Sequence, residues 1–159
     1  NHGMRVKYTY DSVGINSRLD AMQAGILNVK IKHVDSYLDC RRKAAAKYKE
    51  MLADVDEIII PAEQSGCRHT YNQFTIRVKD ERRDELKTYL EENGIPSMIY
   101  YPYPIHQQKA YLESPHRVAG SLTNTENLCK EVLSLPMHTE LEDGIIETIA
   151  STIKDFFKK

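Results

Sequence analysis

Residues 17–52, SRLDAMQAGILNVKIKHVDSYLDCRRKAAAKYKEML, carry the helical pattern that decides the fold. Apolar side chains recur three and four residues apart along two stripes, which is the spacing of amphipathic helices. The first stripe runs from Leu19 to Val29, and the second from Leu27 to Leu52. A helix of about 35 residues would be about 50 Å long, which is more than one small domain covers. We therefore expect a linking helix that packs against two different bodies.

The residues after this helix alternate between strand and helix patterns. Strands are expected over 57–60, 71–78 and 96–101, and helices over 80–93, 106–111 (a single turn), 123–133 and from Thr139 onward. The sequence Thr139-Glu140-Leu141-Glu142 has the spacing of a capping box with Thr139 at the N-cap, so it predicts the start of the last helix. Within the linking helix, Gly25 marks a place for close packing or a bend.

This order of elements predicts an α+β fold, in which a small, mostly antiparallel sheet is covered by helices on one face. Three parts are expected. Residues 1–16 form an irregular polar and aromatic arm, residues 17–52 the long linking helix, and residues 53–159 a small C-terminal α/β domain.

Composition is that of an ordinary soluble domain, with 159 residues, 41% of them hydrophobic, 28% charged, and a net charge of −1. The balanced charge gives no electrostatic reason to expect nucleic acid or an anionic membrane as partner. The basic cluster at 41–43 is interpreted as a solvated helix face. The three cysteines form no CxxC pair and the six histidines no HxxxH pair, so we expect neither a metal site nor a disulfide framework. No apolar run approaches the roughly 20 residues of a membrane span, and we expect a cytoplasmic protein.

The first candidate site is the segment 14–20, where a turn runs into the expected helix. The Asn16 amide and the Arg18 guanidinium are donors that suit a phosphate or a carboxylate. The alternative is that Asn16 or Ser17 only caps the helix. The pattern leaves both interpretations open.

The second candidate site is the segment 99–106, IYYPYPIH. Its two prolines stiffen a loop that follows a strand pattern, and such a loop holds its shape while it presents polar side chains to a ligand. Tyr100, Tyr101 and His106 are the candidates for binding a polar ligand there. The alternative is that one or two of the tyrosines pack in the core and that His106 caps a neighbouring element.

Four motifs carry a resemblance to a known family. They are NHGMRVKYTYDSVGINSRLDAMQAGIL at 1–27, HTYNQFTIRV at 69–78, ENGIPSMIYYPYPIHQQKAY at 92–111, and VLSLPMHTEL at 132–141. In this order and at this spacing the chain resembles the DegT/DnrJ/StrS family of nucleotide-sugar aminotransferases, from Asn1 to about Phe157.

The resemblance implies a pyridoxal-phosphate-dependent enzyme of fold type I. It works as a homodimer on a nucleotide-linked keto sugar with glutamate as amino donor, and residues 1–16 would be the end of its large domain. The residue matching Asn16 reaches the cofactor phosphate in the partner subunit's site, and the one matching Arg18 lies nearby on the substrate side. Tyr100 and Tyr101 match an aromatic pair that lines the sugar-nucleotide pocket, and His106 matches a histidine of the same loop.

The lysine that binds the cofactor covalently lies, in the family, upstream of the matched segment. Lys7 and Lys30 do not stand in the matching context, so we expect no catalytic residue in this chain and no activity from it alone. The function expected is that of the C-terminal portion of a sugar aminotransferase. Two alternatives stay open: a sugar dehydratase of the same family, in which histidine takes the lysine position, and a non-catalytic dimerisation or binding domain that uses the long helix.

Overall fold

The computed structural model describes residues 3–16, 19–113, 115 and 117–158. The elements are β1 (Met4–Val6), β2 (Thr9–Tyr10), α1 (Ala21–Lys30), η1 (Ile31–His33), α2 (Val34–Leu52), β3 (Ile58–Ile59), β4 (Phe74–Val78), α3 (Arg83–Glu92), η2 (Ile105–Gln107), α4 (Lys109–Leu112), α5 (Thr123–Glu131), β5 (Val132–Leu135) and α6 (Asp143–Phe157). η1 and η2 are short 3₁₀ helices.

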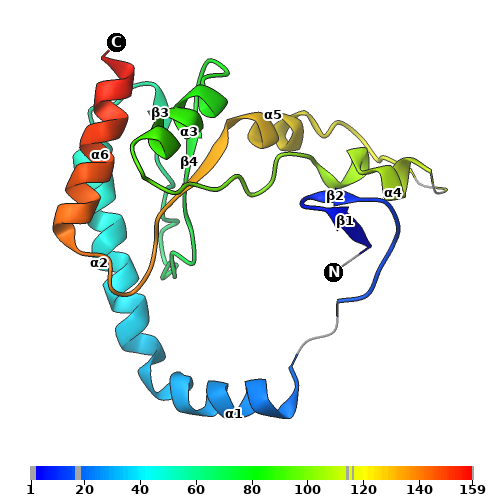
Figure 1. Ribbon diagram of the computed structural model, residues 1–159, viewed down its shortest axis with the longest axis horizontal. Coiled ribbons are helices and arrows are strands. Elements are labelled where there is room, and N and C mark those ends of the chain that lie inside the picture. The colour runs from blue at the N-terminus through cyan, green and yellow to red at the C-terminus, as the bar shows by residue number, and fades with distance from the viewer. Residues whose placement is uncertain (1–2, 17–18, 114, 116, 159) are drawn as a thin grey trace.

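The antiparallel sheet β3-β4-β5 has β4 in the middle. Side chains along β4 alternate between buried and half-buried, because neighbouring residues of a strand point to opposite faces. The buried face shares one hydrophobic core with α2, α3 and α6. Figure 1 shows α2 and α6 side by side along this core. The predicted α+β fold is confirmed.

The centre of the core is an aromatic pair. Tyr48 of α2 and Phe74 of β4 are both fully buried, and their rings stack with centroids 4.9 Å apart. The Tyr48 hydroxyl donates to the carbonyl of Pro136 at 3.1 Å, so this buried polar group is satisfied. Burial raises the pKa of Tyr48 well above its usual value, so the phenol stays neutral. This pair fixes α2 against the sheet.

The third strand of the sheet is β5 and not the expected strand over 96–101. The sequence predicts a helix over 123–133, but α5 ends at Glu131 and the apolar run that follows pairs with β4. Met98 makes only an isolated bridge to Ser134, with backbone N–H···O distances of 3.1 and 2.7 Å. Pro96, two residues before Met98, has no N–H to donate, which explains why the pairing does not extend in that direction.

The predicted capping box is wrong. The last helix begins at Asp143, its N-cap is Glu142, and no side chain caps it. Thr139 and Glu140 form a turn of their own, in which the Glu140 N–H donates to Nδ1 of His138 at 3.2 Å. This turn separates Thr139 from the helix that it was expected to cap.

The helical span from 17 to 52 is not one straight helix. α1 begins at Ala21, after the N-cap Asp20, whose carboxylate accepts from the Gln23 N–H at 2.8 Å. The backbone of His33 leaves the helical region (φ −111°, ψ 1°), and Figure 1 shows α1 turning away from α2 at this point. The bend therefore lies at η1 and not at Gly25.

The basic cluster at 41–43 is not a solvated face throughout. Nη1 of Arg41 donates to the carbonyls of Tyr71, Asn72 and Met137 at 3.1, 3.2 and 3.3 Å. Nη1 of Arg42 donates to the carbonyl of His69 at 3.0 Å. Both side chains therefore attach loops to α2, which the helical pattern alone did not reveal.

The N-terminal arm contains a small hairpin, β1-β2, where an irregular segment was expected. The carbonyl of Gly3 accepts from the backbone N–H groups of Asp11 and Ser12. Gly3 has φ +81°, and a Cβ at this position would lie 1.8 Å from the Ser12 carbonyl oxygen, so the closure requires glycine. Figure 1 shows the hairpin beside α4, far from α6.

None of the helices in the described part of the chain is long and apolar enough to cross a membrane.

Candidate functional site

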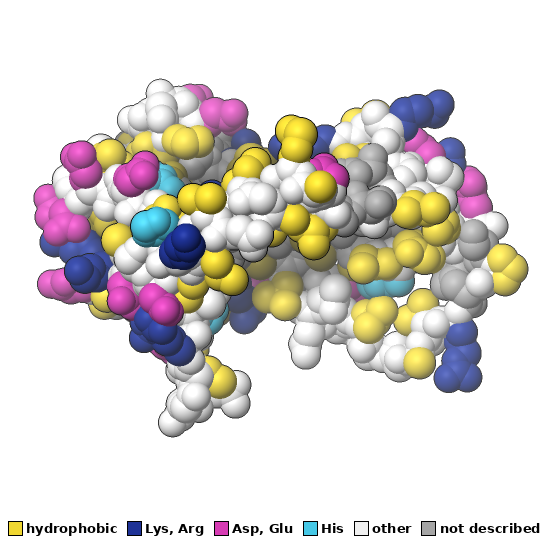
Figure 2. Space-filling view, turned by 90° about the horizontal axis from the view of Figure 1, so that it is seen from below, with side chains coloured by type: hydrophobic (Ala, Val, Ile, Leu, Met, Phe, Trp, Pro, Cys, Tyr) yellow, Lys and Arg dark blue, Asp and Glu magenta, His cyan; other side chains and the backbone are white. Residues whose placement is uncertain are grey.

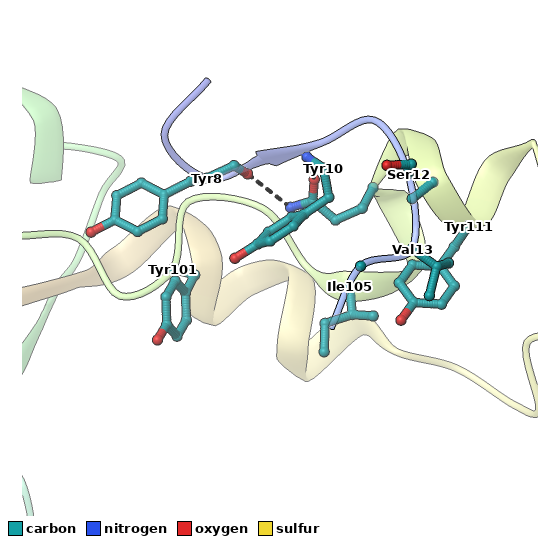
Figure 3. Close-up of a pocket in the computed structure, with 10 residues that line it drawn as sticks. Tyr8, Tyr10, Ser12, Val13, Tyr101, Ile105 and Tyr111 are labelled. Carbon is teal, nitrogen blue, oxygen red and sulfur yellow. Dashed lines mark hydrogen bonds between the residues drawn. The ribbon is translucent and has the colours of Figure 1, made fainter. Parts of the chain in front are cut away.

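A cavity of about 340 Å³ lies between the N-terminal hairpin and the segment 101–111. Its walls come from two parts of the chain that are about a hundred residues apart in sequence. The lining residues are Tyr8, Tyr10, Ser12, Val13, Gly14, Tyr101, Ile105, Gln108, Ala110 and Tyr111. Figure 3 shows the side chains of both parts together. Such a cavity, largely apolar with a few polar groups, is typical of a small-molecule site.

Tyr8 is the aromatic contact between the hairpin and the tyrosine loop. Its ring meets that of Tyr101 edge to face at a centroid distance of 5.6 Å, and that of Tyr100 at 6.3 Å. Burial, with the neighbouring phenols of Tyr100 and Tyr101, raises the pKa of Tyr8 above its usual value. The phenol is therefore neutral at physiological pH, and a neutral phenol can both donate and accept a hydrogen bond.

Gln108 joins the same two segments through its side-chain amide. The amide N–H donates to the carbonyl of Tyr8 at 3.1 Å, and the amide oxygen accepts from the Tyr10 N–H at 3.3 Å. The side chain is buried, with 7% of its surface exposed. The dashed line in Figure 3 marks the bond to Tyr8.

The two candidate tyrosines line different hollows. Tyr101 is 56% exposed and lines the cavity beside the hairpin. Tyr100 lines another hollow of about 310 Å³, next to Met98, Ser134 and Met137 on the polar face of the sheet. The peptide bond between the two tyrosines is cis. Their rings contact each other edge to face, with centroids 5.6 Å apart, so the two tyrosines lie side by side although each lines a hollow of its own.

His106 is held by a carboxylate. Its Nε2 lies 3.0 Å from Oε1 of Glu126, which also accepts from the side chain of Gln107 at 3.3 Å. The imidazole lines a third cavity, of about 380 Å³, together with Arg117 and Thr125. Ile105 and Tyr111 line both this cavity and the one beside the hairpin, so the two are neighbours.

Asn16 is exposed and follows Gly14, the last lining residue of the hairpin segment, by two positions. Because Asp20 is the N-cap of α1, Asn16 does not cap this helix. Arg18 and Ser17 lie outside the described residues, so the structure does not place them. Across the described ranges, no group of His, Cys, Asp and Glu side chains could hold a metal ion.

The sequence did not reveal the parts played by Tyr8, Tyr10 and Gln108. The alternation in Lys7-Tyr8-Thr9-Tyr10 is a short strand signal, but two strand residues are too few to distinguish from an irregular arm. Gln108 carries no local signal, because its partners lie 98 and 100 residues away.

The model of the DegT/DnrJ/EryC1/StrS aminotransferase family matches residues 1–154. The chain belongs to this family.

Similar proteins agree with this assignment. The UDP-N-acetyl-3-dehydro-alpha-D-glucosamine 3-aminotransferase of Acidithiobacillus ferrooxidans is 43% identical over 154 residues, which are 97% of this chain and 40% of that protein. The pleiotropic regulatory protein of Geobacillus stearothermophilus is 40% identical over 159 residues, which are 99% of this chain and 42% of that protein. The crystal structure of S. venezuelae DesV in complex with a ketimine intermediate has a TM-score of 0.80 at 36% identity, and covers 100% of this chain and 42% of its own. The chain thus spans roughly two fifths of the length of these proteins.

Proposed function

We propose that this chain is the C-terminal portion of a pyridoxal-phosphate-dependent aminotransferase that acts on a nucleotide-linked keto sugar, with glutamate as amino donor. In this proposal the enzyme is a homodimer, and the chain contributes contacts to the site of the partner subunit. Asn16 binds the cofactor phosphate. Arg18, Tyr100, Tyr101 and His106 bind the sugar nucleotide.

One observation carries the proposal. The cavity of about 340 Å³ brings Tyr101, a candidate substrate residue, against the segment that ends at Gly14, two residues before the candidate cofactor residue Asn16. The hydrogen bonds of Gln108 hold these two segments together. A surface that binds both the cofactor and the substrate needs the cofactor-binding segment and the substrate-binding loop to lie next to each other. Neither segment alone supplies it.

The residues present fit the phosphate end of pyridoxal phosphate and not its covalent attachment. The exposed Asn16 amide donates hydrogen bonds, and such bonds are stronger when the acceptor is an anion. The polar groups that line the largely apolar cavity are phenols, a hydroxyl and an amide, and no described lining residue is a lysine. Bound pyridoxal phosphate supplies the carrier of the amino group. In this proposal, the residues of this chain bind and orient the cofactor phosphate and the sugar nucleotide.

A dimer is supported by the surface of α1. None of the residues of α1 is buried, although Met22 is 80%, Ile26 58% and Val29 63% exposed. Figure 2 views the molecule from the side on which α1 lies in Figure 1, and shows hydrophobic side chains at the surface. Contiguous exposed apolar surface of this kind marks an interface.

The proposal is tested by asking where the cofactor attaches. The 159-residue chain is incubated with pyridoxal phosphate, reduced with borohydride and mapped by mass spectrometry, with a full-length family member treated in parallel. We expect the full-length protein to be labelled at one lysine and this chain at none in stoichiometric amount. Stoichiometric labelling of a single lysine in this chain would contradict the proposed division of roles.

A further inference from the structure

The Gln108 side chain is a buried link across the candidate site. It both donates to and accepts from the backbone of the hairpin, at Tyr8 and Tyr10, which are the two positions that flank Thr9. An amide pairs in this way with the free edge of a strand, because it offers one donor and one acceptor side by side. With 7% of its surface exposed, Gln108 has little water available to replace these bonds. Loss of either bond leaves a polar group unsatisfied.

The backbone of Gln108 is itself fixed. Its N–H donates to the carbonyl of Ile105 at 3.0 Å, and its carbonyl accepts from the N–H groups of Tyr111 and Leu112 at 2.9 and 3.1 Å. Gln108 thus stands where η2 ends and α4 begins. Its side chain projects from a rigid point toward the hairpin.

An ion pair also joins the two segments, at a more exposed place. Lys109 Nζ lies 3.9 Å from Oδ1 of Asp11, but the lysine is 55% exposed, and exposed ion pairs contribute little. The ring contacts of Tyr8 with Tyr100 and Tyr101 orient the phenols only while the hairpin stays in place. The two amide bonds are buried polar links between the hairpin and the segment where η2 ends and α4 begins.

We propose that Gln108 is a positioning residue, which locks the hairpin and the tyrosine loop into one unit so that Asn16 and Tyr101 are presented together. The inference rests on the proposed function for the roles of Asn16 and Tyr101. It adds that binding of the cofactor phosphate and binding of the sugar nucleotide both depend on the two side-chain hydrogen bonds of Gln108. Substitution of Gln108 then weakens both, whereas substitution of Asn16 or Tyr101 weakens one.

The first test needs no ligand. Hydrogen exchange of the 159-residue chain is compared for wild type, Gln108→Leu and Gln108→Glu, with Gln107→Leu as the matched control. Gln107 is the adjacent glutamine, but its side chain is exposed and bonds to Glu126. We expect the Tyr10 amide to lose about tenfold in protection in Gln108→Leu, as for one lost hydrogen bond, with the Ile76 amide of β4 unchanged. Unchanged protection at Tyr10 would overturn the inference.

Gln108→Glu keeps the proposal testable if the leucine variant fails to fold. Its carboxylate still accepts from the Tyr10 N–H but has no proton to donate to the Tyr8 carbonyl, whereas the protonated acid has one. The protection factor at Tyr10 should therefore rise as the pH is lowered in this variant and not in the Gln107→Leu control. A protection factor that does not depend on pH would count against the link.

The second test uses the full-length parent. We expect Gln108→Leu to raise the KM for the nucleotide sugar and the dissociation constant of pyridoxal phosphate together, each about tenfold, with a smaller change in kcat at saturating cofactor and substrate. A change in only one of the two constants, or in neither, would overturn the coupling. If the wild-type parent shows no transamination that depends on pyridoxal phosphate, the proposed function falls, while hydrogen exchange still decides whether Gln108 docks the hairpin.

Discussion

α1 and α2 have similar apolar stripes in sequence, but only the stripe of α2 is buried in the structure. The C-terminal half of α2 buries Ala44, Ala45, Tyr48 and Leu52 against the sheet and α6. α1 buries no residue, and its apolar side chains face outward. An apolar stripe therefore predicts that one face of a helix packs against something, but it does not predict which element or molecule that is. For α2 the cover lies within the chain. For α1 no described part of the chain supplies it.

Two leucines give the largest expected contrast between these regions. Leu52 is fully buried and Leu27 is 54% exposed. Leu52→Ala should lower the free energy of unfolding by about 2–5 kcal/mol, because it removes apolar burial and leaves a cavity. Leu27→Ala should change it by less than about 0.5 kcal/mol. Urea denaturation of both variants measures the difference, and equal losses would show that α1 is packed within the folded chain.

Self-association gives the next contrast. If the apolar face of α1 is an interface, the chain should associate with rising concentration, and Ile26→Glu should weaken that association about tenfold or more. Ile145→Glu is the matched control, since Ile145 of α6 is also exposed, at 47% against 58% for Ile26. Light scattering over a concentration series measures the effect. A strictly monomeric wild-type chain, or equal effects of the two variants, would contradict it.

A smaller effect is expected in the loop between β3 and β4, which packs against α2. Glu63 accepts from the His69 N–H at 3.0 Å, from Arg42 at 2.7 Å and from the Tyr71 hydroxyl at 3.3 Å. These bonds, the one from His69 first, lower the pKa of the Glu63 carboxyl from 4.5 to about 2.

Because the folded pKa lies below the unfolded one, Glu63 stabilises the fold above pH 4.5, and this contribution is lost as the pH falls from 4.5 to about 2. The stability difference between wild type and Glu63→Gln should therefore shrink across this window. Thermal unfolding as a function of pH measures it. A difference that stays constant from neutral pH down through the window would show that the carboxylate is not paired as described.

The elements that the sequence predicted correctly are those whose signal is local. β4 was expected within 71–78, because its alternation between the buried face and the polar face has the period of a strand. β5 was missed because a short apolar run fits a helix end as well as a strand, and its pairing with β4 decides between them. At Gly25 the sequence indicates close packing or a bend, because glycine is the local signal, whereas the observed bend lies at His33, where α2 begins.

The candidate site shows the same limit. The tyrosine loop was found from its prolines and aromatics, and Tyr101 does line a cavity. Gln108 and Tyr8 were not found, because their contacts depend on how segments about a hundred residues apart fold together. Family resemblance placed Tyr100 beside Tyr101, and their rings do contact each other at a centroid distance of 5.6 Å, while each also lines a hollow of its own.

The central claim is that this surface serves the active site of another subunit, and Asn16 tests it most directly. In the full-length parent, Asn16→Ala should weaken cofactor retention about ten- to a hundredfold, as expected for a hydrogen bond to a charged acceptor. Asn16→Ala subunits are then mixed with subunits that lack the catalytic lysine, at a cofactor concentration too low for the Asn16→Ala homodimer.

If Asn16 acts across the dimer, each mixed dimer has one intact site and one site that carries both defects. If it acts within its own subunit, each site carries one defect. We predict recovery of activity toward half the wild-type level. No recovery, with subunit exchange confirmed by mass spectrometry of the intact dimers, would contradict the account.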